Sequence, residues 1–303
     1  MREYLAIVTA EHAYLRAGAE GESGENTTGI TDEIFSGWAV RVFEEASGKE
    51  YVRVETHYGY EGFVKKGELR EISAGELLQR QDKDRFFRIG ISEADLLETP
   101  KVQGLFRELL LKNSLVELLE RDVVPGWSRV RSAAGREGYV HTVYLRPRKE
   151  DDGYLLQEQQ GDKGYFQTLK DKIAGEEEFR EKLARSAKEY LGTQYRWGGK
   201  SAQGLDCSGL VFMSYLDNGL LIYRDAQIQE GYPVHEISRE QLKKGDLIFF
   251  PGHVAMYLGD GKFIHSTGYE KTPYVLINSL RAEDPDYRQD LAEKIIHCGS
   301  VFA

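Results

Sequence analysis

The chain has 303 residues and a formal net charge of −10 at pH 7, and 41% of its residues are hydrophobic. This length and composition allow one large buried core or two to three smaller ones. The negative charge argues against nucleic acid as a partner, because phosphate binding needs a basic surface. No apolar run approaches the roughly 18 residues of a membrane span, so no membrane partner is expected.

The first residues, MREYLAIVTAEHAYL, contain only the short apolar stretch YLAIV, which is too short for the core of a secretory signal. The two cysteines, Cys207 and Cys298, do not make a disulfide framework. We therefore expect a cytoplasmic protein, or a secreted or periplasmic one if a signal peptide has been removed.

An internal repeat occupies the N-terminal half of the chain. Residues 40–69 align without a gap with residues 116–145, at an offset of 76 positions. Each copy has short alternating strands separated by glycine turns, a pattern typical of small antiparallel barrels. One aligned pair differs in character, because Tyr60 at the hairpin tip HYGYEGF meets Arg136. A barrel therefore does not need a tyrosine at this position.

A polar stretch follows the repeat, and we place a domain boundary near 150–175. The segment EEEFREKLARSAKEYLGTQY then predicts an amphipathic helix that ends at Gly192. Its apolar residues recur at four-residue spacing: Phe179, Leu183, Ala187 and Leu191.

The stretch GLDCSGLVFMSYLDNGL predicts a second helix, with Asp206 as the N-cap and Gly219 as the stop. Cys207 would then lie in the first turn. Unsatisfied N–H groups and the helix dipole stabilise a thiolate there, so we expect a lowered thiol pKa and a nucleophilic cysteine.

Two histidines follow in GDLIFFPGHVAMYLGDGKFIHSTG, where DLIFF, HVAMYL and KFIHS read as strands. A three-residue loop pairs Leu258 with Lys262 and brings His253 and His265 to one face of the hairpin. A two-residue loop puts these histidines on opposite faces. On one face they can act as a base and as the group that orients it. Considered separately, either histidine could instead be an ordinary residue of a turn or of a sheet edge.

These motifs make residues 180–303 resemble an NlpC-type cysteine peptidase of the papain-like superfamily. The matching runs are YLGTQYRWGGKSAQGLDCSGLVFMSYL and LKKGDLIFFPGHVAMYLGDGKFIHSTG. Members of that family hydrolyse bonds in bacterial cell-wall peptides. The resemblance implies that Cys207 is the nucleophile, His253 the general base and acid, and His265 the orienting residue. It also implies that Tyr195 lines the site.

Each copy of the repeat has an aromatic-x-x-Val strand, a glycine hairpin and then Gly-aromatic-Val, which is Gly62-Phe63-Val64 in the first copy and Gly138-Tyr139-Val140 in the second. In this it resembles bacterial SH3-like domains, whose signature has Gly-[Tyr/Trp]-Val. The predicted fold class is therefore multidomain: two small all-β SH3-like barrels followed by an α+β papain-like (NlpC-type) catalytic domain. The predicted boundaries are 1–72 and 85–148 for the barrels, 149–175 for a linker and 176–303 for the peptidase domain.

This architecture resembles the γ-D-glutamyl-L-diamino-acid endopeptidases (dipeptidyl-peptidase VI), which release L-Ala-γ-D-Glu from peptides with a free N-terminal L-alanine. The resemblance implies a murein tripeptide or tetrapeptide as substrate, and no cofactor. Asp225 and Tyr60, with Glu33 as a weaker candidate, would bind the free amine. Asp206 and Ser208 flank the thiol, and Ser208 would meet the α-carboxylate of the γ-D-glutamate. Ala226 departs from the family, which often has serine there.

Three alternatives remain open at this point. The first is a cell-wall amidase or acyltransferase of the same fold without free-amine specificity. The second is a non-catalytic wall-binding protein whose barrels carry the function. The third is a metal site, although the spacing of its possible ligands matches no zinc motif; these ligands are Cys207, His253, His265, His297 and Cys298.

Overall fold

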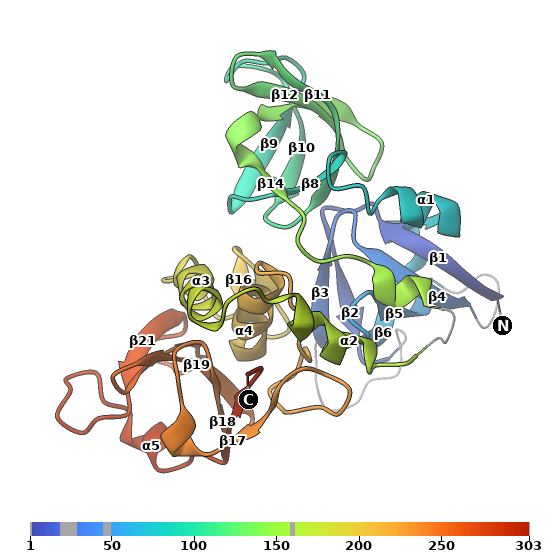
Figure 1. The fold of residues 1–303 in the computed structure, drawn as a ribbon. Helices are drawn as coiled ribbons and strands as arrows, with labels where there is room; N and C mark the ends of the chain where they lie inside the picture. The colour runs from blue at the N-terminus through green and yellow to red at the C-terminus, as the bar shows by residue number, and fades with distance from the viewer. Residues whose placement is uncertain (1, 19–28, 45–49, 158–160, 303) are drawn as a thin grey trace. The chain divides into compact units, whose positions relative to one another are not determined.

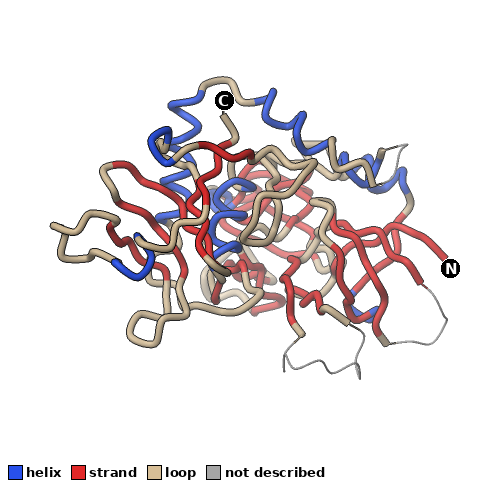
Figure 2. The backbone as a smooth tube through the Cα atoms, turned by 90° about the horizontal axis from the view of Figure 1, so that it is seen from below, coloured by secondary structure: helices blue, strands red, loops and turns tan. Residues whose placement is uncertain are grey.

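The computed structural model describes residues 2–18, 29–44, 50–157 and 161–302. The chain divides into two compact units, Met1–Gln160 and Gly161–Ala303. Strands and loops predominate, and the longest helix has 13 residues among those described (Figures 1 and 2). No helix in the described ranges is long and apolar enough to cross a membrane.

The N-terminal unit contains two seven-stranded antiparallel sheets with one common strand order. The first runs β3-β2-β6-β5-β4-β1-β7 and the second runs β10-β9-β13-β12-β11-β8-β14. The first sheet comprises β1 Arg2–Val8, β2 His12–Arg16, β3 Ile30–Phe35, β4 Ala39–Glu44, β5 Tyr51–Thr56, β6 Glu61–Lys65 and β7 Leu69–Ile72. The second comprises β8 Phe86–Ile89, β9 Glu93–Leu97, β10 Phe106–Leu111, β11 Leu115–Val124, β12 Trp127–Arg131, β13 Glu137–His141 and β14 Leu145–Pro147. The short helices of this unit are η1 Lys66–Glu68, α1 Ala74–Gln79, η2 Thr142–Tyr144 and η3 Gly153–Leu156.

This common order confirms the internal repeat. β5 begins at Tyr51 and β12 at Trp127, which preserves the offset of 76 positions. The register agrees as well, since Val54 pairs with Val42 just as Val130 pairs with Leu118. Residues 45–49 of the first copy lie outside the described residues. We call the two copies the first repeat (2–72) and the second repeat (86–147).

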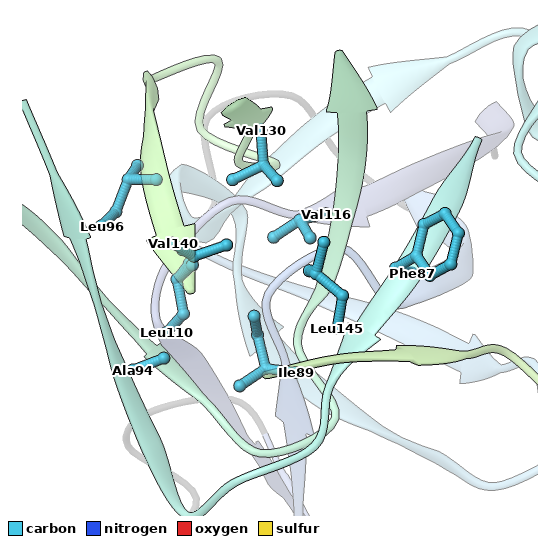
Figure 3. Close-up of a cluster of buried hydrophobic side chains, with 9 residues drawn as sticks. All are labelled: Phe87, Ile89, Ala94, Leu96, Leu110, Val116, Val130, Val140 and Leu145. Atoms are coloured by element: carbon cyan, nitrogen blue, oxygen red, sulfur yellow. The ribbon is translucent and has the colours of Figure 1, made fainter. Parts of the chain in front are cut away.

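Alternating strand residues fill the interior of the second repeat, as a sheet with one buried face requires. Figure 3 shows these side chains converging from its strands. A large side chain that is fully buried in this interior stabilises the fold by roughly 1.5–3 kcal/mol, because it is removed from water. The cluster consists of Phe87, Ile89, Ala94, Leu96, Leu110, Val116, Val130, Val140 and Leu145.

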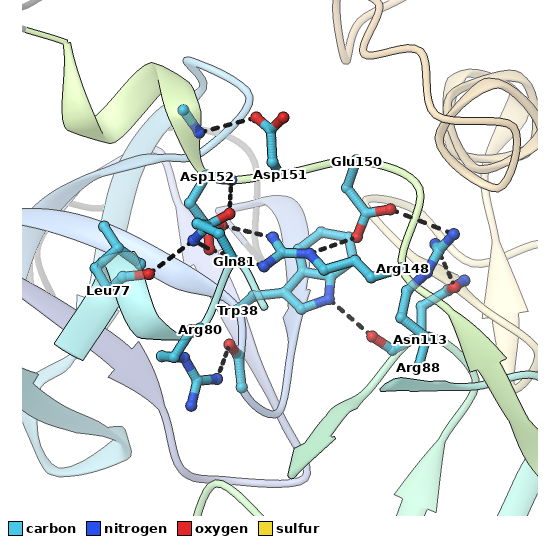
Figure 4. A network of polar contacts seen from close by, with 12 residues as sticks. Trp38, Leu77, Arg80, Gln81, Arg88, Asn113, Arg148, Glu150, Asp151 and Asp152 are labelled. Atoms are coloured by element: carbon cyan, nitrogen blue, oxygen red, sulfur yellow. Dashed lines mark hydrogen bonds and ion pairs between the residues drawn. The ribbon is translucent and has the colours of Figure 1, made fainter. Parts of the chain in front are cut away.

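Polar contacts join the two repeats within the N-terminal unit. The Trp38 indole donates to the Asn113 carbonyl at 2.9 Å (Figure 4). Arg148 binds both carboxylate oxygens of Asp152 at 2.7 and 2.9 Å. Glu150 accepts from Arg148 and forms an ion pair with Arg88 at 3.2 Å. All four charged side chains of this junction network are buried.

The predicted linker, residues 149–175, contains the boundary between the two units, and each of its two parts is packed within its own unit. Tyr154 is buried in the N-terminal unit and donates to Glu55 at 2.6 Å. In the C-terminal unit Phe166 is buried and stacks on Tyr232, with ring centroids 4.6 Å apart. The predicted domain boundaries stay a prediction.

The C-terminal unit has helices packed on a six-stranded sheet of order β17-β22-β18-β19-β20-β21. Its strands are β15 Lys200–Ser201, β16 Gly204–Leu205, β17 His235–Ile237, β18 Leu247–Phe250, β19 His253–Gly259, β20 Lys262–Ser266, β21 Val275–Ser279 and β22 His297–Ser300. Its helices are α2 Tyr165–Thr168, η4 Leu169–Lys172, α3 Glu176–Lys188, α4 Cys207–Leu216, η5 Arg239–Gln241 and α5 Gln289–Ala292.

The helix expected to end at Gly192 is shorter than predicted. α3 stops at Lys188, and Leu191 is exposed rather than part of the apolar face. Gly192 instead adopts a left-handed conformation with φ of 80° in the turn that follows. α4 matches its predicted start, and all its residues are buried, because it packs against α3 and the sheet.

Candidate active site

The start of α4 places Cys207 in the first helical turn. Asp206 has an extended backbone, and its side chain accepts from the Gly209 N–H at 2.6 Å, the geometry of an N-cap. Cys207 is 7% exposed. Its sulfur accepts hydrogen bonds from the backbone N–H groups of Ser208 and Val254. The thiol therefore lies between the helix start and β19, beside the residue that follows His253.

The expected lowering of the thiol pKa is wrong. Burial, and then the negative charge of Asp206, raise the pKa of the Cys207 thiol to about 12. The two backbone N–H groups and Arg224 act in the opposite direction but are outweighed. At neutral pH Cys207 is therefore a neutral thiol, and it needs a base before it can react.

The β19–β20 hairpin combines features of both loops considered from the sequence. Its tip is a two-residue turn, Asp260–Gly261, with positive φ at both residues. Between Tyr257 and Gly259 the register shifts by one residue, so Leu258 forms a bulge. Beyond the bulge Tyr257 pairs with Phe263, the register expected for the three-residue loop.

The bulge thus brings both histidines to one face. Nε2 of His253 lies 2.8 Å from Nδ1 of His265. Nε2 of His265 lies 2.9 Å from Oδ1 of Asn278 on β21, and the Asn278 amide donates to the Asp286 carbonyl at 3.1 Å. These residues form one hydrogen-bonded chain across three strands. We call His253, His265 and Asn278 the histidine relay.

The relay determines the position of each proton. Since the Asn278 amide nitrogen donates to Asp286, its oxygen must accept the proton on Nε2 of His265. A neutral His265 then accepts at Nδ1, so His253 must donate from Nε2. The free lone pair of His253 is therefore on Nδ1.

Both imidazoles are neutral at physiological pH. Burial, and then the positive charge of Arg288, lower the pKa of His253 to about 4. Burial and the neighbouring His253 lower the pKa of His265 to about 3. His253 is consequently available as a base.

Asp206 and Ser208 are tied to a buried arginine that sequence reasoning did not assign. Arg224 is 1% exposed and contacts both Asp206 oxygens, at 3.1 and 3.2 Å. It also donates to the Ser208 hydroxyl at 2.7 Å, and Ser208 in turn donates to Asp206 at 3.1 Å. The only hydroxyl hydrogen of Ser208 is thereby used. A substrate carboxylate could accept from Ser208 only after that hydroxyl rotates away from Asp206.

The other predicted site residues are divided between the two units. Tyr195 is half-buried, and burial followed by the nearby Cys207 raises the pKa of its phenol. Asp225 accepts a hydrogen bond from Tyr223 and lines a small pocket with Val254. Tyr195 therefore lies close to the start of α4, and Asp225 lies close to α4 and β19.

Tyr60 and Glu33 belong to the N-terminal unit. Tyr60 follows β5, and its backbone N–H donates to the Thr56 hydroxyl at 3.0 Å. The Glu33 side chain is fully buried, 3.9 Å from the His12 imidazole. Within the described ranges, no group of three or more His, Cys, Asp or Glu side chains is arranged to hold a metal ion.

Comparisons with known proteins give consistent results. The family model described as the NlpC/P60 family matches residues 192–284. Dipeptidyl-peptidase 6 of Lysinibacillus sphaericus is 37% identical over 277 residues, which cover 90% of this chain and 92% of that protein. A γ-D-glutamyl-L-lysine dipeptidyl-peptidase of Bacillus cereus is 39% identical over 118 residues, 36% of this chain and 34% of that protein. The crystal structure of an NlpC/P60 family protein from Bacillus cereus aligns over 97% of this chain and 98% of its own, with a TM-score of 0.70 at 22% identity.

A thiol at a helix start, bonded to the strand that carries a histidine relay, is the arrangement of a cysteine peptidase. The similarity extends over both units rather than over the C-terminal one alone. The chain belongs to the NlpC/P60 family.

Proposed function

We propose that the protein is a cysteine endopeptidase that hydrolyses the γ-D-glutamyl–diamino acid bond of murein peptides with a free N-terminal L-alanine. The observation that carries the proposal is the histidine relay, which begins at the residue just before Val254, whose N–H donates to the Cys207 sulfur. The names of the relatives, dipeptidyl-peptidase 6 and γ-D-glutamyl-L-lysine dipeptidyl-peptidase, support the choice of bond. The substrate is a murein tripeptide or tetrapeptide.

In the proposed reaction Nδ1 of His253 takes the proton of the Cys207 thiol as the sulfur attacks the amide carbonyl. The relay holds the imidazole in the required tautomer and stabilises the imidazolium that forms. The Cys207 N–H, one of the first N–H groups of α4, stabilises the developing oxyanion. His253 then returns its proton to the leaving amine, and water hydrolyses the thioester.

Specificity for the free amine rests on a carboxylate and a phenol. Asp225 supplies the negative charge and Tyr60 a hydrogen-bonding hydroxyl, with Glu33 as a further candidate. Tyr195 lines the site. We also propose that the two repeats are SH3-like barrels, since their shared strand order and glycine hairpins agree with that class of small all-β domain. In this reading the first repeat takes part in substrate selection.

The test is mass spectrometry of the products formed from L-Ala-γ-D-Glu-L-Lys and from its N-acetylated form. We expect L-Ala-γ-D-Glu and lysine from the free-amine peptide, much less from the acetylated one, and neither product with Cys207→Ala. A charge-assisted hydrogen bond of about 1.5–3 kcal/mol corresponds to roughly 10- to 150-fold in kcat/KM. Asp225→Asn should lose at least that much, and Tyr60→Phe somewhat less.

The acetylated peptide is the internal control, because it has no ammonium group for Asp225 or Tyr60 to bind. Equal cleavage of both peptides would contradict the free-amine specificity and favour an amidase or acyltransferase of the same fold. Full activity of Cys207→Ala would exclude the proposed nucleophile.

A further inference from the structure

One buried cation in the N-terminal unit has no counter-ion among the residues that the structure describes. The described residues include six buried arginines. Five of them contact a carboxylate within 4 Å: Arg41, Arg88, Arg148, Arg180 and Arg224. Arg80, at the end of α1, is 6% exposed, and no described carboxylate lies within 4 Å of it.

The contacts of Arg80 leave much of its guanidinium unsatisfied. Nη2 donates to the Gly37 carbonyl at 2.8 Å, and the charge lies 4.9 Å from the centre of the Phe86 ring. Nε is buried and has no hydrogen-bond partner among the described residues. Burial lowers the pKa of Arg80 to about 10, so it still carries its charge at neutral pH. A buried cation without a partner is costly, and native proteins normally pair it.

The nearest acidic groups are already engaged. Asp152 is close enough to act on Arg80 electrostatically, but Arg148 binds both of its oxygens. Glu76 forms an ion pair with Arg70 at 2.8 Å. Figure 4 draws Arg80 at the edge of the junction network, where its dashed line leads to a backbone carbonyl and not to a carboxylate.

Arg80 lines a cleft of about 960 Å³ formed by α1 and both repeats. Four arginines but only two glutamates line it: Arg70, Arg80, Arg85, Arg131, Glu76 and Glu117. Glu117 is held by Arg85 and Arg131, and Arg131 also contacts Glu137 outside the lining. The cleft thus has a local excess of positive charge in a chain whose net charge is −10. Its volume suits a small-molecule ligand.

We propose that this cleft binds an oxyanion, a phosphate or carboxylate group of a small molecule, with Arg80 as its main partner. The guanidinium offers a planar set of N–H donors that matches the oxygens of either group. The bound anion supplies the counter-ion that the described carboxylates do not, and it connects α1 to the second repeat. This inference does not depend on the proposed peptidase activity.

The experiment is isothermal titration calorimetry of the full chain with inorganic phosphate and with citrate, at constant ionic strength set by chloride. We expect saturable binding of at least one probe, and that probe identifies the class of anion. Arg80→Met should weaken binding by at least about 10-fold. The same probe should raise the Tm of the wild type but not that of Arg80→Met.

Two further variants keep the test decisive if Arg80→Met folds poorly. Arg85→Met removes a half-exposed cleft arginine paired with Glu117, and it should weaken binding. Arg107→Met removes an arginine of similar exposure paired with Glu98 outside the lining, and it should bind normally. Absence of saturable binding overturns the proposal, as does unchanged binding in both Arg80→Met and Arg85→Met.

Cys207→Ala separates this site from the peptidase site. It should bind the anion as the wild type does, whether or not it cleaves peptide. Loss of anion binding in Cys207→Ala would place the anion at the active site and overturn the proposal.

Discussion

His253 and Cys207 are both neutral in the resting protein, because each is buried next to groups that disfavour its charge. The pKa of His253 is lowered to about 4, and the pKa of Cys207 is raised to about 12. In the proposed reaction the proton therefore moves from sulfur to Nδ1 during the attack rather than before it. Such a pair differs from the preformed thiolate that a helix start favours when the thiol is more exposed.

This arrangement predicts the pH dependence of kcat/KM for the free-amine peptide. Protonated His253 cannot act as a base, so activity should fall only as the pH approaches about 4. The thiol should give no alkaline limb below pH 12. The α-amine of the substrate loses its proton near pH 7.7–8.0, so activity should decline above about pH 8. Steady-state kinetics between pH 4 and 9, with circular dichroism as a check on folding, would measure this.

An acid limb near pH 6–7 would contradict the neutral pair, because it would require an imidazole with an ordinary pKa. An alkaline limb that persists when the amine is replaced by a permanently charged trimethylammonium group would contradict its assignment to the substrate.

The sequence was sufficient to place Cys207 at a helix start and the two histidines on adjacent strands, because N-caps and alternation are local signals. It did not reveal Asn278 or Arg224 as partners. An isolated asparagine in a strand and an isolated arginine in a loop carry no local signal, and their roles depend on contacts between distant segments. The direction of the thiol pKa shift was missed because it depends on how completely α4 is buried.

At the scale of elements, the start of α4 is held by the Arg224–Asp206 ion pair. The carboxylate caps the helix, accepts from the Gly198 N–H at 2.9 Å and neutralises a buried guanidinium at the same time. Arg224 reaches back to the Gly199 carbonyl at 3.3 Å. The pair therefore connects the glycine-rich approach, the helix start and the loop that carries Asp225.

Substitution of either Arg224 or Asp206 should leave the charge of the other residue buried without an opposite charge beside it. We expect Arg224→Met to lower the free energy of unfolding by about 3–5 kcal/mol. Asp206→Asn should also destabilise, although an asparagine can still cap the helix. The double variant should lose less than the sum of the two single variants, since it contains no unpaired buried charge. Urea denaturation of all four proteins would measure this coupling.

Lys182→Met is a suitable control, because it breaks an exposed ion pair with Glu178 on α3. Lys182→Met should change the free energy of unfolding by only about 0.3–0.5 kcal/mol. Strict additivity of Arg224→Met and Asp206→Asn would show that the ion pair does not hold the helix start.

At the scale of the whole molecule, the chain reuses one small sheet arrangement, and buried charged side chains attach the segment after the second repeat to that repeat. The pKa values of Asp152 and Glu150 are lowered, because the neighbouring arginines outweigh the effect of burial. Carboxylates with lowered pKa values stabilise the folded state above their unfolded pKa of about 4, and this contribution is lost as the pH falls. The junction network therefore makes the N-terminal unit sensitive to acid.

Arg148→Met should lower the free energy of unfolding by about 3–5 kcal/mol at pH 7, since it leaves the buried Asp152 without its main partner and removes one of the two arginines beside Glu150. The difference from the wild type should shrink toward pH 4, because protonated carboxylates no longer need the guanidinium. Arg146→Met, an exposed neighbour on β14 that donates to the Val143 carbonyl, is the matched control. Chemical denaturation at both pH values would measure the effect, and a difference that grows on acidification would contradict this account.

The Leu258 bulge has a consequence for the lengths of chain that evolution can accept in the β19–β20 hairpin. Loss of the single codon for Leu258 would remove only the extra residue, because Gly259 would still lie opposite Lys262 and Tyr257 would still lie opposite Phe263. His253 and His265 would then remain on one face of the hairpin. Working enzymes should therefore occur both with and without this extra residue.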